Sequence, residues 1–266
     1  MERNFLLTIE YDGSNFSGWQ RQPGVRTVQG ELESVLSKVC GGEVKLNGTS
    51  RTDAGVHALG QRASFRGEYG IPTDRIMTAA NNYLFGGRRL GTQVGDVRIK
   101  ALEEKPLDFH ARFDAKGKKY RYVIQNGSET DLFRRNYCYY VPAPLSAEAM
   151  REAAQYIEGT HDFACFQASG GQPRETTVRT VHSLTVSERM APQPQEEQEE
   201  KEIIIEIAGD GFLYNMVRII TGTLVEAGLG RKKPEQVKEI IKSGQRSLAG
   251  HTAPPQGLYL VEVYYE

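Results

Sequence analysis

Strand-like and helix-like segments alternate along the whole 266-residue chain, and this alternation limits the fold more than any other feature of the sequence. Residues 5–11 (FLLTIEY) form a β-rich run. Residues 28–39 place apolar side chains at three- and four-residue spacing, directly after an N-capping Thr27, which predicts an amphipathic helix. Further strands are expected at 43–46, 58–65 and 94–102, and a second helix at 73–84. The first half is therefore predicted to run β-α-β-loop-β-α-β.

The second half repeats this mixture less regularly. We expect strands at 118–125, 178–186, 202–208 and 258–265, and helices at 146–158 (capped by Ser146), 213–228 and 234–243. The stretch 191–201, rich in Pro, Gln and Glu, is expected to be a mobile hairpin excursion. Because strands and helices occur in both halves, the sequence predicts an α+β protein of two lobes, residues 1–104 and 105–266.

The charge of the chain is unevenly distributed. The formal net charge is −1, but residues 195–202 (QEEQEEKE) hold five Glu and one Lys, so the rest of the chain carries +3. Residues 1–120 contain 18 Lys and Arg against 14 Asp and Glu. A single acidic run is usually a solvated loop, and it need not mask a basic face elsewhere. The distribution permits binding to nucleic acid without proving it.

Several classes of protein are disfavoured by what the sequence lacks. No apolar run is long enough to cross a bilayer, and the N-terminus has no signal-peptide layout, so we expect a cytoplasmic protein. The three cysteines are widely spaced with no CxxC pair, and the five histidines never fall at metal-ligand spacing. We expect neither a disulfide scaffold nor a metal site.

A carboxylate, Asp53, lies in the small-residue segment GTSRTDAGVH at 48–57, between two predicted strands. Gly55 permits backbone angles that other residues resist, and loops held by a sheet are favoured places for reactive groups. Arg51, two residues away, could pair with Asp53 and hold it ionised. The chemistry alone leaves an alternative open, because aspartates routinely occupy turns and bond to their own backbone.

Five segments, in order, are similar to motifs of the tRNA pseudouridine synthase A family. They are Tyr11-Asp12-Gly13 through Gly18-Trp19-Gln20-Arg21-Gln22 and Thr27 to Leu32; the loop Gly48 to His57; Phe109-His110-Ala111-Arg112-Phe113 with Lys119-Tyr120-Arg121-Tyr122; Asp210 to Arg218; and Ala249 to Tyr259. Together they span nearly the whole chain, which makes the resemblance far more specific than one Asp-x-Gly loop. Ser50 departs from the pattern, because many family members carry Gly there.

The resemblance implies a fold and an activity. The fold would be the pseudouridine synthase fold, in which two α+β lobes share a mixed, largely antiparallel central sheet flanked by helices. The activity would be isomerisation of uridine to pseudouridine at positions 38, 39 and 40 in the anticodon stem-loop of tRNA, on a base flipped into a cleft between the lobes. The resemblance further implies a homodimer and a reaction that needs no cofactor and no metal.

The resemblance also assigns roles to single residues. Asp53 would be the nucleophile, and Tyr120 would place its ring against the target uracil, as suits a splayed-out base. Arg218, in a predicted helix of apolar neighbours, needs a partner, and Asp53 is the expected one. Arg51 would pair with Asp53 or contact a phosphate of the flipped nucleotide, while His57 is expected to pack the loop.

Two other functional classes stay open on the residues themselves. One is a non-catalytic RNA-binding protein that uses its sheet and aromatic residues as a platform. The other is a different enzyme, such as a glycosidase or a nuclease, which would need a second carboxylate or a cluster of acids. Glu10 and Asp12 are close in sequence, but their position at a strand end favours structural roles. Neither class explains the five ordered motifs.

Overall fold

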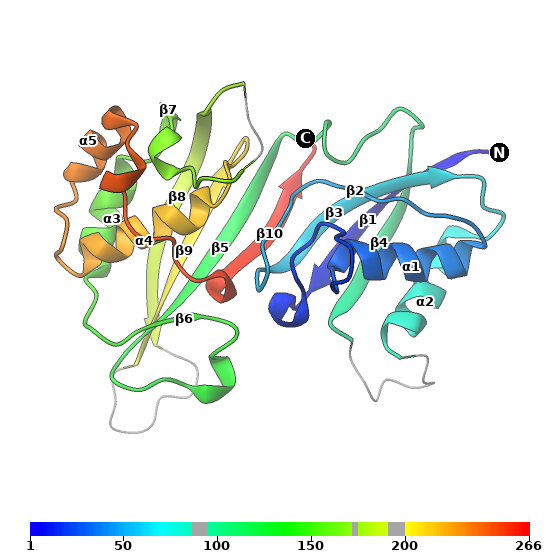
Figure 1. The fold of residues 1–266 in the computed structure, drawn as a ribbon, viewed down its shortest axis with the longest axis horizontal. Coiled ribbons are helices and arrows are strands. Elements are labelled where there is room, and N and C mark those ends of the chain that lie inside the picture. Colours follow the sequence, from blue (N-terminus) through cyan, green and yellow to red (C-terminus); the bar gives the residue numbers. More distant parts are fainter. Residues whose placement is uncertain (87–94, 172–174, 191–199) are drawn as a thin grey trace. The chain divides into compact units, whose positions relative to one another are not determined.

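The computed structural model describes residues 1–86, 95–171, 175–190 and 200–266. Their contacts divide the chain into two compact units, Met1–Lys116 with Tyr259–Glu266, and Gly117–Leu258. Each unit combines helices with a mixed, largely antiparallel set of strands, so the predicted α+β class is confirmed (Figure 1). The expected division into lobes after residue 104 stays a prediction, and these contact-defined units place 105–116 and the last strand with the N-terminal residues.

The strands of the first unit are ordered β4-β1-β3-β10. β1 (Arg3–Tyr11) pairs antiparallel with β3 (His57–Gly67) and with β4 (Val97–Lys105). The two-residue β2 (Asn47–Gly48) pairs antiparallel with β3, and β10 (Leu258–Tyr264) pairs with β3 in parallel. The strand carrying the start of the Asp53 loop and the strand that follows that loop are therefore hydrogen-bonded neighbours.

Two helices complete the first unit, and both were predicted. In α1 (Val28–Cys40) the Thr27 hydroxyl accepts from Gly30 N at 3.3 Å, and Gly41 ends the helix with φ +71°. α2 runs over the predicted residues, Thr73–Leu84. Figure 1 shows α1 and α2 together, in agreement with the contacts between them and between α2 and β4.

The prediction of a strand at 43–46 is wrong, because backbone N–H groups of that segment donate to side chains of α1 and not to a neighbouring strand. Leu46 N donates to Glu33 Oε1 at 2.9 Å, and Val44 N donates to Ser37 Oγ at 2.9 Å. Gln29 Nε2 donates to Leu46 O at 3.0 Å. The apolar Val44 and Leu46 are buried as expected, but the segment is fixed by a helix instead of a neighbouring strand.

Glu33 is a buried carboxylate, and its hydrogen bond to Leu46 N should stabilise the segment 43–46. Replacing Glu33 by Ala leaves the buried Leu46 N without its acceptor, and we expect the free energy of unfolding to fall by about 1–3 kcal/mol. Glu33→Gln keeps the acceptor oxygen and serves as the matched control with a smaller loss. Urea unfolding of both variants measures the difference; equal losses would show that the acceptor does not matter.

The strands of the second unit are ordered β5-β9-β8-β7. β5 (Gly117–Asn126) pairs antiparallel with β9 (Lys201–Gly209), which pairs antiparallel with β8 (Val178–Met190), and β7 (Gly159–Asp162) lies antiparallel beyond β8. The short β6 (Tyr139–Val141) pairs with β5 in parallel. The sequence did not predict β6 or β7, which have only three and four residues.

Three helices complete the second unit. They are α3 (Ala147–Gln155), capped by Ser146 as predicted, α4 (Met216–Gly228) and α5 (Gln236–Ser243). α4 begins three residues later than predicted because its N-cap, Asn215, is left-handed with φ +60°. α4 is buried on nearly every side, which explains its continuous apolar sequence.

Two sequence predictions fall wholly or partly outside the described residues. The hairpin excursion expected at 191–201 lies almost entirely outside them, and so does Val94, where a strand was expected to begin. The strand itself, β4, begins at Val97, because residues 95 and 96 are described and lie outside it. No helix in the described ranges is long and apolar enough to cross a membrane.

Candidate active site

Asp53 lies in the loop between β2 and β3, in the first unit. The backbone folds back there, because Val56 N donates to Asp53 O at 3.2 Å and Gly55 has φ +79°. Asp53 is half-buried, and Arg51 is exposed. The structure thus places the carboxylate in a tight turn carried by a sheet, while the ion pair between Arg51 and Asp53 stays a prediction.

The N-terminal segment braces this loop at Thr52. Trp19 N donates to Thr52 O at 3.0 Å, and the hydroxyls of Tyr11 and Thr52 lie 2.7 Å apart in a buried hydrogen bond. Gly18 has φ +89°, and a Cβ there would lie 2.7 Å from Thr52 O. Only glycine allows this approach. The motif that contains Gly18 and Trp19 therefore holds the loop from Gly48 to His57 in position.

His57 closes the other end of the loop. It is buried, its Nδ1 accepts from Gly13 N at 3.0 Å, and its ring stacks on Tyr259 at 4.8 Å between centroids. The same nitrogen lies 3.2 Å from Asp12 Oδ1. These contacts support the interpretation of His57 as a packing residue, and they give Asp12 a structural role at the strand end.

Gln61, on β3, is a supporting residue that the sequence reasoning missed. Its side chain is fully buried; Nε2 donates to Ser50 O at 2.7 Å, and Oε1 accepts from Ser50 N at 3.3 Å. Ser50 is the position that departs from the family pattern, and its backbone makes both bonds. A glutamine inside the strand predicted at 58–65 is the signal that could have revealed it, because a buried amide needs partners.

The close approach of Gly18 to the loop gives a direct test. In Gly18→Ala the added methyl group meets Thr52 O and moves the loop, so we expect kcat/KM for the activity that the sequence predicts, modification of tRNA, to fall by on the order of 10–100-fold. Gly24→Ala is the matched control, because Gly24 also has a positive φ of +76° but has nothing within 4 Å of its Cβ position. Steady-state kinetics compare the two; similar losses would show that backbone strain, and not the contact, is responsible.

Tyr120 and Tyr122 both lie on β5 in the second unit. Tyr120 is 6% exposed, with its ring edge-on to Phe212 at 5.2 Å. Tyr122 is fully buried and donates its hydroxyl to Pro254 O at 2.6 Å, and burial raises its pKa well above the usual value. The contacts of Tyr122 are those of a structural residue in the core, whereas the substrate role of Tyr120 stays a prediction.

Arg218, on the first turn of α4, is half-buried and held by backbone and side-chain oxygens of the second unit. Nε donates to Ala253 O at 2.7 Å, and Nη1 donates to Asn215 Oδ1 at 2.9 Å. Ala253 N in turn donates to Arg218 O at 3.1 Å. The expectation that this guanidinium needs partners is met by these contacts, and its pairing with Asp53 stays a prediction.

Glycine allows the segment that carries Ala253 to lie directly against α4. A Cβ on Gly222 of α4 would lie 1.9 Å from His251 O, and Gly250 N donates to Thr223 Oγ1 at 2.8 Å. The motif from Ala249 to Tyr259 thus packs directly against α4, which begins within the motif from Asp210 to Arg218. The orientation of Arg218 follows from that contact.

The predicted site residues divide between the units. Arg51 and Asp53 share one loop of the first unit, and Tyr120 and Arg218 belong to the second. Among the described residues, no group of three or more His, Cys, Asp or Glu side chains is arranged to hold a metal ion.

Comparison with known proteins identifies the family. A sequence model described as tRNA pseudouridine synthase matches residues 7–114 and 153–266, which include Asp53 and Arg218. The chain belongs to the tRNA pseudouridine synthase family. Its members are isomerases that act on tRNA.

Relatives over the full length agree with this family. Proteins named tRNA pseudouridine synthase A from Acetivibrio thermocellus, Ruminiclostridium cellulolyticum and Thermoanaerobacter sp. are 47%, 46% and 45% identical to this chain. Each alignment covers 99% of this chain and 100% of the relative. Tyr120, which lies outside the residues matched by the family model, is inside these alignments. Among solved structures, a protein of unknown function from Galdieria sulphuraria covers 86% of the chain at 9% identity, but a TM-score of 0.24 identifies no fold.

Proposed function

We propose that this family member converts uridine to pseudouridine at positions 38, 39 and 40 of the tRNA anticodon stem-loop, with Asp53 as the nucleophile. The observation that carries the proposal is the Arg51-Thr52-Asp53-Ala54-Gly55-Val56-His57 loop. Its sequence matches the family's catalytic pattern, and its backbone is braced at Thr52 and at His57. A rigid frame on both sides is what a reacting carboxylate needs, since small misplacements of a catalytic group slow a reaction strongly.

The reaction is a balanced isomerisation. The bond between C1′ and N1 breaks, the uracil turns within the site, and a bond forms between C1′ and C5. C5 then loses its proton and N1 gains one, so no oxidant, reductant or leaving group is consumed. Asp53 attacks C1′, attacks C6 of the uracil, or removes a proton from C2′, and these three routes stay open.

The other site residues act on the same nucleotide in this proposal. The target base leaves the helical stem, which costs a few kcal/mol, and enters a cleft between the lobes. Tyr120 stacks on the uracil, Arg218 pairs with Asp53, and Arg51 pairs with Asp53 or binds the phosphate of the flipped nucleotide. Support for Arg218 comes from its backbone partners, because a guanidinium held at Nε and Nη1 is fixed in direction before any substrate binds.

The proposed setting is a homodimer in the cytoplasm, with each tRNA contacting both subunits. No cofactor or metal takes part in the proposed steps. The support is the resemblance of the sequence along its whole length to one family.

Asp53→Asn tests the nucleophile. The amide keeps the size of the side chain but loses the carboxylate, so we expect no pseudouridine in tRNA, with an affinity for tRNA within about two-fold of the original. Asp74→Asn, at an exposed position in the first turn of α2, is the control and should keep full activity. Mass spectrometry of chemically labelled tRNA measures the product. Pseudouridine formed by Asp53→Asn would overturn the assignment and favour a different catalytic group.

Salt dependence tests the electrostatic part of binding. The chain outside residues 195–202 carries a net charge of +3, and contacts of Lys and Arg with phosphates release counterions. We expect the affinity for tRNA to fall by about ten-fold or more as salt rises from about 50 to 200 mM. Equilibrium binding measurements across that range give the slope of log affinity against log salt concentration. An affinity that does not change with salt would contradict an electrostatic contribution to binding.

A further inference from the structure

The motif Phe109-His110-Ala111-Arg112-Phe113 forms a closely bonded turn of the first unit, between β4 and β5. Phe113 N and Asp114 N both donate to His110 O at 3.1 Å. The His110 ring accepts at Nδ1 from Arg112 N at 3.1 Å, and Asp114 Oδ2 accepts from His110 N at 2.7 Å. Backbone and side chains hold the turn together, so its exposed residues have defined positions.

The middle of the turn is anchored in the interior. Ala111 is fully buried, and its N donates to Ser64 Oγ on β3 at 3.1 Å. Its carbonyl oxygen accepts from Tyr265 Oη at 2.8 Å and from Thr49 Oγ1 at 3.0 Å. Thr49 lies four residues before Asp53, so the turn is bonded to the segment that leads into the Asp53 loop.

This anchored turn presents an aromatic ring to solvent. Phe113 is 75% exposed, its ring lies 4.3 Å from that of His110, and the Arg112 guanidinium lies 5.8 Å from its centroid. Single exposed apolar residues are common and need no explanation. A phenylalanine fixed by an ordered turn between an arginine and a histidine is different, because base stacking and phosphate binding use this combination.

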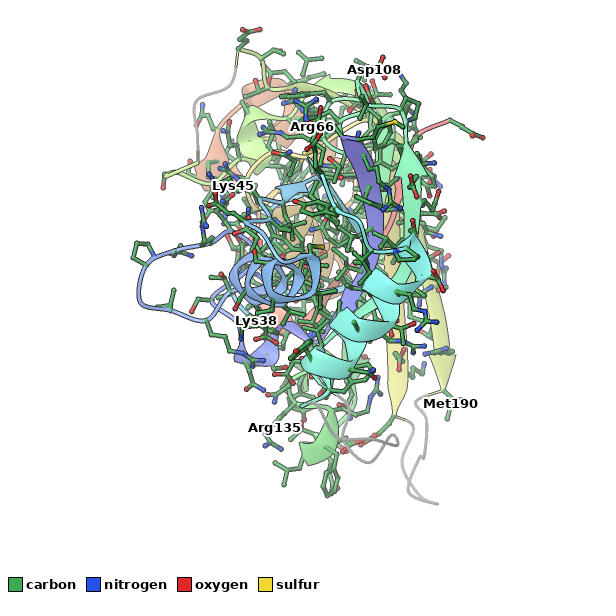
Figure 2. The ribbon with its side chains drawn as sticks, turned by 90° about the vertical axis from the view of Figure 1, so that its right-hand side faces the viewer. Lys38, Lys45, Arg66, Asp108, Arg135 and Met190 are labelled. Carbon is green, nitrogen blue, oxygen red and sulfur yellow. The ribbon has the colours of Figure 1, made fainter. Side chains whose placement is uncertain are left out.

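The surroundings of the turn are cationic. Within the described ranges, Arg66, Arg112 and Lys116 form no ion pair, and Arg66 Nη1 donates to Leu107 O at 3.2 Å. Figure 2 shows Arg66 and Asp108 at the same end of the first unit. The acids of the same segment are Asp108, which is exposed, and Asp114, which accepts from His110 N and keeps its negative charge. With three cations that have no ion-pair partner in the described ranges against these two acids, the turn keeps a small excess of positive charge, which favours an anionic partner.

We propose that this turn is a tRNA contact separate from the target nucleotide, in which Phe113 stacks on an unpaired base and Arg112 binds an adjacent phosphate. The proposal rests on the proposed function only in taking tRNA as the ligand. The hydrogen bond that Thr49 Oγ1 donates to Ala111 O then holds the bound RNA at a fixed distance from the Asp53 loop. Recognition is by the presence of an unstacked base, since any base offers a face to the ring.

A second copy of the chain fits the turn less well. A stable dimer interface buries on the order of 1,200–2,000 Å² and is depleted of charge at its core. Phe113 is a single ring with the Arg112 guanidinium beside it, and a two-fold contact through this turn would bring two copies of that charge together.

The test uses three replacements of Phe113 in the full chain, with binding measured on unmodified tRNA transcript and on a blunt-ended RNA duplex of similar length. For tRNA we expect Phe113→Ala and Phe113→Leu each to weaken binding by about ten-fold, and Phe113→Trp to retain it, because the ring and not apolarity matters. For the duplex, which offers no unpaired base, all three should change binding by less than about two-fold. Tyr83→Ala, which removes a 56% exposed ring from α2, is the matched control.

Arg112→Ala gives a second, independent signature. Loss of a phosphate contact should weaken binding to both RNAs and lower the salt slope by about one unit. In turnover, Phe113→Ala should raise KM with kcat at saturating tRNA unchanged, as expected for a residue that contacts the RNA away from the reacting atoms.

Several outcomes would overturn the inference. They are unchanged tRNA binding in Phe113→Ala, equal weakening on tRNA and duplex, and retained affinity in Phe113→Leu. A change in oligomeric mass without a change in tRNA affinity would assign the turn to a second copy of the chain. Asp53→Asn distinguishes a failure of the proposed function from a failure of this inference. If that variant forms pseudouridine, Asp53 is not the nucleophile, but the effect of the Phe113 variants on tRNA binding is unchanged.

Discussion

The approach of Gly18 to the backbone of Thr52 is the contact on which the candidate active site of the first unit depends. A side chain at position 18 would occupy the space of the Thr52 carbonyl oxygen. Because that space is free, Trp19 N reaches the same oxygen, and Tyr11 reaches the Thr52 hydroxyl. The direction of the Asp53 loop is thus set by hydrogen bonds from a segment more than thirty residues earlier in the chain.

The second unit places its arginine by the same kind of contact. Gly222 on α4 lets the segment around His251 lie directly on the helix, and this brings the Ala253 carbonyl to Arg218 Nε. Asn215, left-handed at the start of α4, supplies the second acceptor. In both units a glycine removes the side chain that would separate two backbone segments, and a polar group of the site is oriented as a result. This explains why the motifs contain so many small residues besides the reactive ones.

Much of the local structure could be predicted from the sequence because it depends on neighbouring residues. Thr27 caps α1, Ser146 caps α3, and α2 occupies the predicted residues, since capping and amphipathic spacing act within a few positions. The strand expected at 43–46 failed for the opposite reason. Its backbone donors are taken by Glu33 and Ser37 of a helix, and no local pattern reveals such partners. The late start of α4 also depends on a backbone conformation, that of Asn215, which the apolar pattern does not show.

The sequence by itself determined the family, the α+β class and the loop that carries Asp53, because ordered motifs and residue periodicity are properties of the chain. It did not reveal that Gln61 holds Ser50, that Gly18 braces Thr52, or that Ala111 connects an exposed Phe113 to Thr49. Only the tertiary structure decided these points. Each is a contact between segments far apart in sequence, and its geometry exists only once the strands are paired and the side chains are packed.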